Sequence, residues 1–401
     1  MKRAVITAQG LVAAKALNAE VFWQMVKRGQ SAIAPFSRFD PTETGCTFGG
    51  EVPPFSYDFI PQDMKPKRMA RHTVLLLKAA EQLRQSLPLT RPFGLRIGLA
   101  TSDSTMIAQS GIQRVTKGVA SVGPTSATQS PPHAAVGTLS TILKPQGEVH
   151  TVTTACAAGL DAIGLAARDV MDGRAECVLA GGADSPLGVT PLLEFVKSGL
   201  ASTRNHCPAR ASRPFDIFAD SGVIGEAAAL VLVEEMESAL KRGARILGEI
   251  VGYGNRPDPL PTVPGSGYAA CMASALESAQ LDRCDIDYIS AWGPGHPVID
   301  VAELRAIEEV FGSWADDLPV SSIKGVIGNP LSAAGPAQVI AALQGLAEQV
   351  LPPTANLEIP VDGFRLRFIR DEFEEYDHTT VLINAHGLGG ANSSLIVRRW
   401  A

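Results

Sequence analysis

Short apolar runs alternate along the chain with longer segments in which apolar residues recur every third or fourth position. Short continuous runs are typical of buried strands, whereas the wider spacing is typical of amphipathic helices. On this basis we predict strands at residues 4–7, 95–99, 178–180, 228–233, 246–251, 288–291 and 379–384. Alternation of the two patterns over the whole chain predicts an α/β fold.

Cys156 lies where a predicted strand gives way to a predicted helix. Residues 149–154 are rich in Val and Thr, which favour an extended chain. Apolar residues at helical spacing follow, and Gly173 stands where that helix should end. The spaced residues are Leu160, Ile163, Ala167 and Val170.

The position of this cysteine supports two interpretations. At the first turn of a helix, the macrodipole and the free backbone N–H groups favour the thiolate, which would make Cys156 a nucleophile. Free cysteine is also among the most buried residue types, so Cys156 could equally be a small core residue. Position alone gives the two interpretations similar weight.

A charged break at residues 241–245 divides the chain into unequal parts. We predict two packed halves, residues 1–243 with Cys156 and residues 244–401, with reactive groups between them. Proline predicts loops at residues 257–264 and 351–354.

Composition limits the classes of function. Of 401 residues, 45% are hydrophobic and 19% are charged, which is typical of a well-packed globular protein. The net charge of -6 argues against nucleic acid as the main ligand, because phosphate binding needs a basic surface. Six cysteines form no C-x-x-C pair and no leader precedes the first apolar run, so we expect a cytoplasmic protein with reduced thiols. We expect neither a metal site nor a cofactor.

Residues 118–142 contain no Asp, Glu, Lys or Arg, yet they do not suit a membrane. Their Pro, Ser, Thr and Gly content makes a poor lipid-facing helix. We expect a loop followed by a helix at residues 134–143, and no membrane span.

Seven motifs, in order and over nearly the entire chain, resemble those of the β-ketoacyl-acyl-carrier-protein synthases of the elongating type, in the thiolase superfamily. They are Phe22-Trp23 with Arg38-Phe39-Asp40, Thr154 to Gly159, Ala180 to Asp184, Ser212 to Asp216, Asp220 to Glu226, Ile323-Lys324-Gly325 and Gly387 to Asn392. The resemblance implies a thiolase-like, duplicated α-β-α-β-α five-layer sandwich, usually a dimer.

The resemblance also implies a reaction. In that family the cysteine takes an acyl chain from an acyl carrier protein, which splits one difficult reaction into two easier steps. Two histidines then help to decarboxylate a malonyl group and stabilise the enolate, while backbone N–H groups hold the thioester oxyanion. By this resemblance, Cys156 is the nucleophile, and the N–H groups of Cys156 and Leu388 form the oxyanion hole.

The chain departs from the family pattern where the histidines belong. Residues 292–296 correspond to the first histidine motif, which puts Trp292 at the first histidine. Residues 324–329 correspond to the second, which puts Asn329 at the second. Gln338 stands where the family usually has a glutamate that positions the lysine. Neither Trp nor Asn is a base near neutral pH, although both donate hydrogen bonds.

These departures predict an altered reaction. Acyl transfer onto Cys156 needs a thiolate and an oxyanion hole, which the helix N-terminus and the backbone at Cys156 and Leu388 can still supply. Condensation loses its principal donors, and the loss of one such donor typically costs about 10²–10³ in rate. We expect Trp292 to fill or reshape the pocket and Lys324 to make internal hydrogen bonds near Asn329. Among possible substitute bases, His386 is favoured over His296 and His206.

Charged residues outside the site suggest other roles. We expect Asp220 and Glu226 to hold the core loop together. A basic cluster matches the region that resembles the family's carrier-docking helix and could steer an acidic carrier protein; the alternative is an ordinary solvated helix face. The cluster is Lys65, Lys67, Arg68 and Arg71.

Two functional classes follow. The first is an acyltransferase or altered condensing enzyme of fatty-acid or polyketide synthesis, with Cys156 as nucleophile and Asn329, Trp292, Lys324 and His386 around it. The second is a non-catalytic partner that resembles the chain-length factors paired with an intact ketosynthase. Retention of Cys156 favours the first class. The resemblance leaves open a homodimer or a heterodimer with a paralogous ketosynthase.

Overall fold

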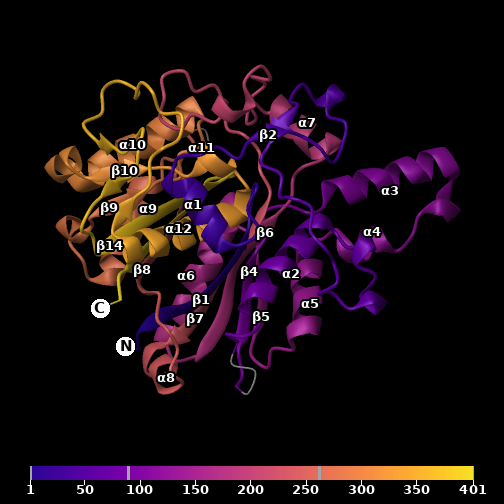
Figure 1. The fold of residues 1–401 in the computed structure, drawn as a ribbon, viewed down its shortest axis with the longest axis horizontal. Helices are drawn as coiled ribbons and strands as arrows, with labels where there is room; N and C mark the ends of the chain where they lie inside the picture. Colours follow the sequence, from indigo (N-terminus) through magenta and orange to yellow (C-terminus); the bar gives the residue numbers. More distant parts are fainter. Residues whose placement is uncertain (1, 88–90, 261–262, 401) are drawn as a thin grey trace.

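Eleven strands form one continuous sheet in the computed structural model, which describes residues 2–87, 91–260 and 263–400 (Figure 1). The first part of the chain supplies β1 (Ala4–Val12), β4 (Gly94–Gly98), β5 (Val149–Val152), β6 (Cys177–Asp184) and β7 (Ala227–Glu235). The second part supplies β8 (Gly248–Pro257), β9 (Tyr288–Ser290), β10 (Pro319–Ser321), β14 (Thr380–Gly387) and β15 (Ala391–Arg398). A short strand, β12 (Arg367–Phe368), extends the edge beside β10.

The two sets of five strands repeat one topology. The order in space is β5-β4-β6-β7-β1 in the first set and β10-β9-β14-β15-β8 in the second, which is third, second, fourth, fifth and first along the chain in both. In each set the first two neighbouring pairs are parallel and the last two are antiparallel. The sets join through a short β1–β8 pairing from Ala4 opposite Ile250 to Ile6 opposite Gly248. This repeat confirms the predicted duplicated fold.

Helices complete the layers. α6 (Ala158–Met171) and α12 (Ala334–Glu348) lie between the two halves of the sheet and contact strands of both. α2 (Arg71–Leu83) and α5 (Pro132–Leu143) cover the outer face of the first half, and α9 (Tyr268–Ala279) with α10 (Pro297–Phe311) covers that of the second. The remaining α-helices are α1 (Ala19–Lys27), α3 (Ser104–Lys117), α4 (Thr125–Gln129), α7 (Val189–Lys197), α8 (Met236–Lys241) and α11 (Lys324–Ile327).

Outside the main sheet, two strand pairs are β2 (Ala34–Pro35) with β3 (Phe48–Gly49) and β11 (Val350–Leu351) with β13 (Glu374–Glu375). α3 and α4 project from the body (Figure 1), and Val115 on α3 is among the most exposed apolar side chains. Within the described ranges, no helix has both the length and the apolar character needed to cross a bilayer.

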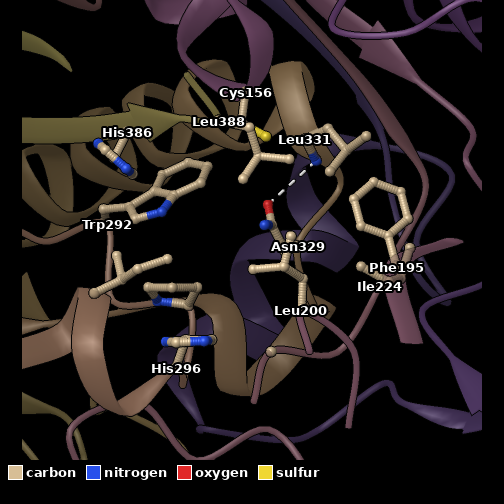
Figure 2. A pocket seen from close by; sticks show the side chains of 13 residues that line it. Cys156, Phe195, Leu200, Ile224, Trp292, His296, Asn329, Leu331, His386 and Leu388 are labelled. Atoms are coloured by element: carbon tan, nitrogen blue, oxygen red, sulfur yellow. Dashed lines mark hydrogen bonds between the residues drawn. The ribbon is translucent and has the colours of Figure 1, made fainter. Parts of the chain in front are cut away.

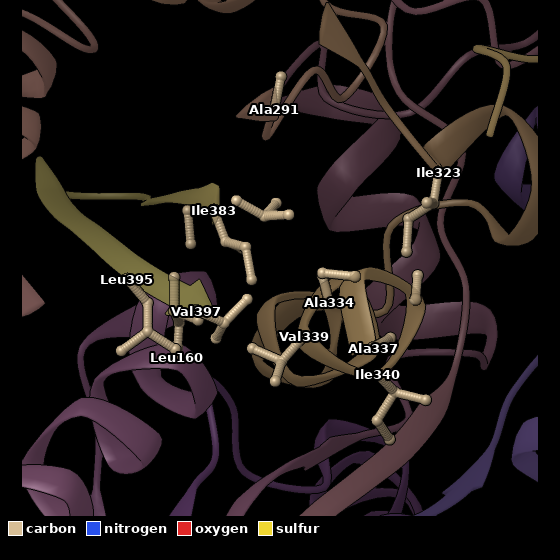
Figure 3. Close-up of a cluster of buried hydrophobic side chains, with 14 of the residues drawn as sticks. Leu160, Ala291, Ile323, Ala334, Ala337, Val339, Ile340, Ile383, Leu395 and Val397 are labelled. Carbon is tan, nitrogen blue, oxygen red and sulfur yellow. The ribbon is translucent and has the colours of Figure 1, made fainter. Parts of the chain in front are cut away.

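The central helices pack tightly because their contact residues are small. A Cβ on Gly159 of α6 would lie only 2.1 Å from the carbonyl oxygen of Ser332, so a larger residue would force the two halves apart. Figure 3 shows Leu160 of α6 near Leu395 and Val397 of β15, with Val339 of α12 beside them. Burial of this apolar surface stabilises the layers at roughly 25 cal/mol per Å².

The predicted elements are present, and most of their boundaries are longer or shifted by a residue. All seven predicted strands overlap observed strands, and residues 134–143 lie within α5. Gly173 follows α6 with a φ of 74° and ends it as expected. Two expected loops begin with strand residues, because β8 extends to Pro257 and β11 includes Leu351, and residues 261–262 lie outside the described residues. Sequence periodicity missed β10 and β15.

Candidate active site

Cys156 is held on a short, strained turn between β5 and α6. Ala155 has a φ of 49°, a left-handed conformation that costs a residue with a side chain about 1 kcal/mol or more. The turn continues as the 3-10 helix η5 (Ala155–Ala157), so the cysteine immediately precedes the α-helix. The hydroxyl of Thr154 donates to the carboxylate of Asp161, which anchors the start of the turn. The strand and the buried helix therefore fix the sulfur.

The end of β14 approaches this turn closely. A Cβ on Gly387 would lie 2.8 Å from the carbonyl oxygen of Thr154 and 3.1 Å from the backbone nitrogen of Cys156, so this position needs glycine. The approach brings the backbone N–H of Leu388 beside the sulfur, and this group and the N–H of Cys156 both act to lower the pKa of the thiol. The structure thus brings together both N–H groups that the sequence suggested.

Burial decides the protonation of this thiol. Cys156 is only 7% exposed, and loss of solvation together with the nearby Asp184 carboxylate raises the pKa of the thiol to about 12. The N–H of Leu388 and the charge of Lys324 act in the opposite direction without reversing the shift. The predicted preference for the thiolate near neutral pH is therefore wrong, because desolvation outweighs the helix terminus. At neutral pH the thiol form of Cys156 therefore predominates.

A small, largely apolar cavity of about 40 Å³ opens beside the sulfur. Figure 2 shows the indole of Trp292 and the amide of Asn329 facing this space near Cys156. Its lining comes from both halves of the chain: Cys156, Phe195, Leu200, Gly222, Ile224, Trp292, Pro294, His296, Ile299, Asn329, Leu331, His386 and Leu388. The arrangement places a thiol, two imidazoles, an indole and an amide around one cavity.

Trp292 is fixed by its backbone. The N–H groups of Trp292 and Gly293 each donate to the carboxylate of Glu303 at 2.8 Å, and this carboxylate also accepts from the amide of Asn384 at 3.0 Å. Burial raises the pKa of Glu303, whereas these hydrogen bonds act against that increase. With the side chain 2% exposed, the indole forms a rigid wall of the cavity.

Lys324 lies completely buried behind this wall. Its ammonium group donates to the carbonyl oxygen of Trp292 at 2.9 Å and to Oε1 of Gln338 at 3.0 Å, and lies 4.0 Å from the centre of the Trp292 ring. Burial lowers the pKa of Lys324 to about 7, although the charge of Glu303 opposes this decrease. Gln338 in turn donates to three backbone carbonyl groups, those of Ser290, Ala291 and Asn384. These contacts give Lys324 the internal role that the sequence predicted.

Asn329 presents an oriented amide to the cavity. Its Oδ1 accepts from the N–H of Leu331 at 3.2 Å, and its backbone carbonyl accepts from Gly225 at 3.0 Å. Because Oδ1 already accepts a hydrogen bond from the backbone of Leu331, the amide –NH₂ is the group left to donate toward a ligand. Asn329 can therefore stabilise negative charge but cannot accept a proton from a thiol.

The three candidate histidines occupy different environments. His386 is 4% exposed and lines the cavity next to the indole of Trp292 (Figure 2). His296 lines the opposite side, and its Nδ1 accepts from the N–H of Val298 at 3.3 Å, which caps α10. Burial lowers the pKa of His296. His206 is exposed and does not line this cavity.

The carboxylates of Asp220 and Glu226, which were expected to hold the core loop together, make structural contacts. Glu226 is buried and accepts from the N–H of Val52 at 3.0 Å and from the guanidinium of Arg38 at 2.9 Å. Asp220 accepts from Ser202 at 3.1 Å and forms an ion pair with Arg204 at 3.2 Å. Neither residue lines the cavity, in keeping with the role expected from the sequence.

The basic cluster divides into two parts. Lys65, Lys67 and Arg68 are exposed. Arg71 instead turns inward, with Nη2 3.0 Å from Oε1 of Glu226, because a buried carboxylate requires a positive partner. The expectation that all four residues form one exposed face is therefore wrong for Arg71. We call the three exposed residues the basic patch.

Sequence reasoning missed several residues of the site. Phe195, Leu200 and Ile299 form apolar walls, and only the fold brings them to the sulfur. Asn392 contacts His386 at 2.9 Å and lies inside a motif that the sequence had marked without giving that residue a role. Within the described parts of the chain, no group of three or more His, Cys, Asp and Glu residues is arranged to hold a metal ion.

Comparison with known proteins identifies the family. Residues 1–239 match the family described as Beta-ketoacyl synthase, N-terminal domain, and residues 244–358 match Beta-ketoacyl synthase, C-terminal domain. The chain belongs to the β-ketoacyl synthase family. It is 32% identical to 3-oxoacyl-[acyl-carrier-protein] synthase 2 of Synechocystis, covering 100% of this chain and 98% of that protein. It is 33% identical to the same-named synthase of Coxiella burnetii, with 99% of each covered.

Solved β-ketoacyl synthases have the same fold. A β-ketoacyl synthase from Burkholderia phymatum superposes with a TM-score of 0.91 at 31% identity, with both chains covered completely. The ishigamide ketosynthase/chain length factor gives a TM-score of 0.92 at 27% identity, also over 100% of both chains. A chain from a type II polyketide synthase acyl-carrier protein in complex with its ketosynthase gives a TM-score of 0.91 at 27% identity, again over 100% of both chains. The relatives are transferases of fatty-acid or polyketide synthesis.

Proposed function

We propose that this β-ketoacyl synthase is an acyltransferase that takes an acyl group from an acyl carrier protein onto Cys156. The observation that carries the proposal is the sulfur itself, which opens onto a cavity and receives the backbone N–H groups of Cys156 and Leu388. When an acyl thioester occupies this place, the same N–H groups are suited to hold its oxyanion. This step needs no cofactor.

The proposal includes an altered second half-reaction. Trp292 and Asn329 stand where the family pattern has histidines, and both side chains line the cavity as hydrogen-bond donors. Donors of this kind can polarise a carbonyl group, but neither can serve as a base. His386 is the cavity-lining imidazole that we assign to proton transfer, with Lys324 supporting the wall from behind.

An acyl carrier protein is the proposed partner. Carrier proteins are acidic, and the exposed patch of Lys65, Lys67 and Arg68 offers complementary charge on a chain of net charge -6. A complex of a type II polyketide synthase acyl-carrier protein with its ketosynthase has the same fold. We infer a cytoplasmic setting from the six unpaired thiols. We also propose that the chain consists of two halves, residues 1–243 and residues 244–401.

We propose that the protein acts as a dimer, with itself or with a paralogous ketosynthase. β5 is the edge strand of the sheet, with Val149 38% exposed, and Val115 on the projecting α3 is 84% exposed. An unpaired sheet edge and, at a separate place on the surface, exposed apolar side chains both suit a protein partner. Light scattering of the protein alone and after co-purification with a histidine-complete paralogue would distinguish the two assemblies.

The test of the acyltransferase is covalent. The protein is mixed with acyl-carrier protein, and intact-mass spectrometry with peptide mapping locates any acyl adduct. We expect one acyl group on Cys156 and none on the Cys156→Ala variant, while a Cys284→Ala control, which removes an exposed thiol, keeps the adduct. Absence of an adduct on the wild type, with unchanged pathway output from Cys156→Ala, would overturn the proposal.

That negative outcome would favour the second candidate, a chain-length-factor-like partner without catalysis. One observation supports it: the Trp292 indole takes up space beside a buried thiol whose pKa is about 12. The ishigamide ketosynthase/chain length factor shares the fold over its whole length. A partner of this kind would set product length through its cavity, so Trp292→Ala would change product length even in the Cys156→Ala background.

A further inference from the structure

Hydrogen bonds at the rim of the cavity determine which ring nitrogen of His386 carries the proton. Asn392 is completely buried and follows β14 at the start of β15. Its Nδ2 donates to Oδ1 of Asp258 at 2.8 Å and to the backbone carbonyl of Arg256 at 3.1 Å. Because both neighbours are acceptors, the –NH₂ side of the amide has to face them. The opposite side, Oδ1, then faces His386.

The imidazole has to donate to this oxygen. Nδ1 of His386 lies 2.9 Å from Oδ1 of Asn392, and an amide oxygen can only accept a hydrogen bond. In the neutral ring, Nδ1 therefore carries the hydrogen and Nε2 keeps the lone pair. The ring of Tyr268 packs against the imidazole with centroids 5.3 Å apart, which restricts rotation of the histidine.

The other cavity-lining imidazole has the opposite tautomer. Nδ1 of His296 accepts from a backbone N–H, so in the neutral ring its Nε2 carries the hydrogen and donates. Trp292 and Asn329 also present N–H groups. Among the nitrogen-bearing side chains that line the cavity, His386 alone is set by its partners to accept a proton.

We propose that Asn392, held by Asp258, is a positioning residue that fixes the hydrogen of His386 on Nδ1 and so makes Nε2 the proton acceptor for acyl transfer at Cys156. The inference rests on the proposed function. The Sγ–H proton passes to Nε2 as sulfur bonds to the acyl carbon. The bond between that carbon and the carrier sulfur then breaks, and the carrier thiolate takes the proton back from the imidazolium.

The first test reads the tautomer directly and does not depend on activity. Protein labelled with ¹⁵N in its histidine rings is examined by NMR, and His386→Phe identifies the signals of His386 by their loss. We expect Nδ1 to have the shift of a protonated ring nitrogen and Nε2 that of an unprotonated one at neutral pH. The reverse assignment, or a mixture of both tautomers, would overturn the inference even if Cys156 is acylated.

A matched exchange tests the positioning role. Asp258→Asn with Asn392→Asp keeps one carboxylate and one amide but puts the carboxylate against Nδ1. Since a carboxylate stabilises the imidazolium, the acidic limb of the pH profile for Cys156 acylation should move up by about one pH unit. Asn392→Ala should slow acylation about tenfold at neutral pH, because nothing then selects the tautomer.

A purely structural role for Asn392 predicts a different result. The exchange would then lower the rate at every pH by a similar factor and leave the acidic limb in place. The titratable groups that line the cavity or surround Tyr268 beside the imidazole are Asp258, His296, Asp300, Glu303, Cys156 and Tyr268 itself. The thiol and the phenol titrate far above the acidic limb. An unacylated wild type would contradict the proposed function, whereas the NMR result would still decide the tautomer.

Discussion

The two walls of the cavity, one from each half of the duplicated fold, differ in what their side chains can do. The first half supplies Cys156 on a strained turn. The second half supplies Trp292 and Asn329 from two loops, and both donate hydrogen bonds but accept no proton. Cys156, the proposed nucleophile, thus lies opposite side chains that donate hydrogen bonds but cannot act as bases.

The backbone supports of the two walls are equally well built. On the first side, Asp184 accepts from the N–H groups of Ala100 and Ser332 at 3.0 and 2.9 Å. On the second side, Glu303 accepts from Trp292 and Gly293 at 2.8 Å. A decayed site would be expected to lose such buried supports, because each unpaired group costs about 1–3 kcal/mol. The difference between the walls therefore lies in side chains that face the cavity.

The largest expected effect comes from making the second wall match the family pattern. Trp292→His combined with Asn329→His should raise single-turnover condensation with malonyl-carrier protein by about 10²–10³, because one well-placed donor is worth that much. Product formation is measured by mass spectrometry. Asn329→His alone is the matched control and should give a smaller gain, since the indole still fills its share of the cavity. An unchanged rate in the double variant would mean that Trp292 and Asn329 are not what limits condensation.

The next effect comes from the protonation state of the Cys156 thiol on the first wall. Since the pKa of Cys156 is about 12, its alkylation by iodoacetamide should quicken about tenfold for each pH unit from about pH 7 to 10, in proportion to the thiolate. The rate is followed by mass spectrometry of the peptide that contains Cys156. A plateau already near pH 7 would show that the helix terminus outweighs burial after all.

A smaller effect is expected at the basic patch, which lies outside both walls. Lys67→Glu or Arg68→Glu should raise the KM for acyl-carrier protein about two- to fivefold, since an exposed charge contributes about 0.5–1 kcal/mol. Transfer from a small acyl thioester without a carrier should be unaffected. Lys241→Glu, an equal charge change at an exposed site on α8, is the control. Equal effects of all three substitutions would exclude specific docking.

A separate effect, on stability and not on activity, concerns the support behind Trp292. Lys324 has a pKa of about 7 in the folded protein, below the value of about 10.4 for an unfolded chain. Between these values the unfolded chain binds one more proton, so this group makes the protein more stable as pH rises. Relative to Lys324→Met, the wild type should gain up to about 1.4 kcal/mol per pH unit between about pH 7 and 8.5.

Urea denaturation of both proteins at several pH values measures this difference. Subtracting the free energy of unfolding of Lys324→Met from that of the wild type removes the contributions of other groups, such as the buried thiols, that are common to both proteins. Parallel stability curves would mean that Lys324 remains charged in the folded state at these pH values.

Sequence patterns predicted the parts of the fold for which the apolar periodicity and the order of the motifs indicate the same element. Apolar runs located the seven strands, and motif order indicated the duplication seen in the strand order of the sheet. β10 and β15 were missed because three-residue strands and strands with consecutive polar residues, such as Asn392 to Ser394, carry no clear period. Cys156, Trp292, Asn329 and His386 were all named from the sequence and do share one cavity.

The sequence by itself determined the family, because membership depends on residue type and motif order, and it singled out Cys156 as the proposed nucleophile. Only the tertiary structure decided that burial raises the pKa of Cys156, that Arg71 turns inward to Glu226, and that Asn392 sets the tautomer of His386. Each of these depends on desolvation or on contacts between residues that lie on different elements. Such effects arise from distance and exclusion of water, which no local pattern of residues records.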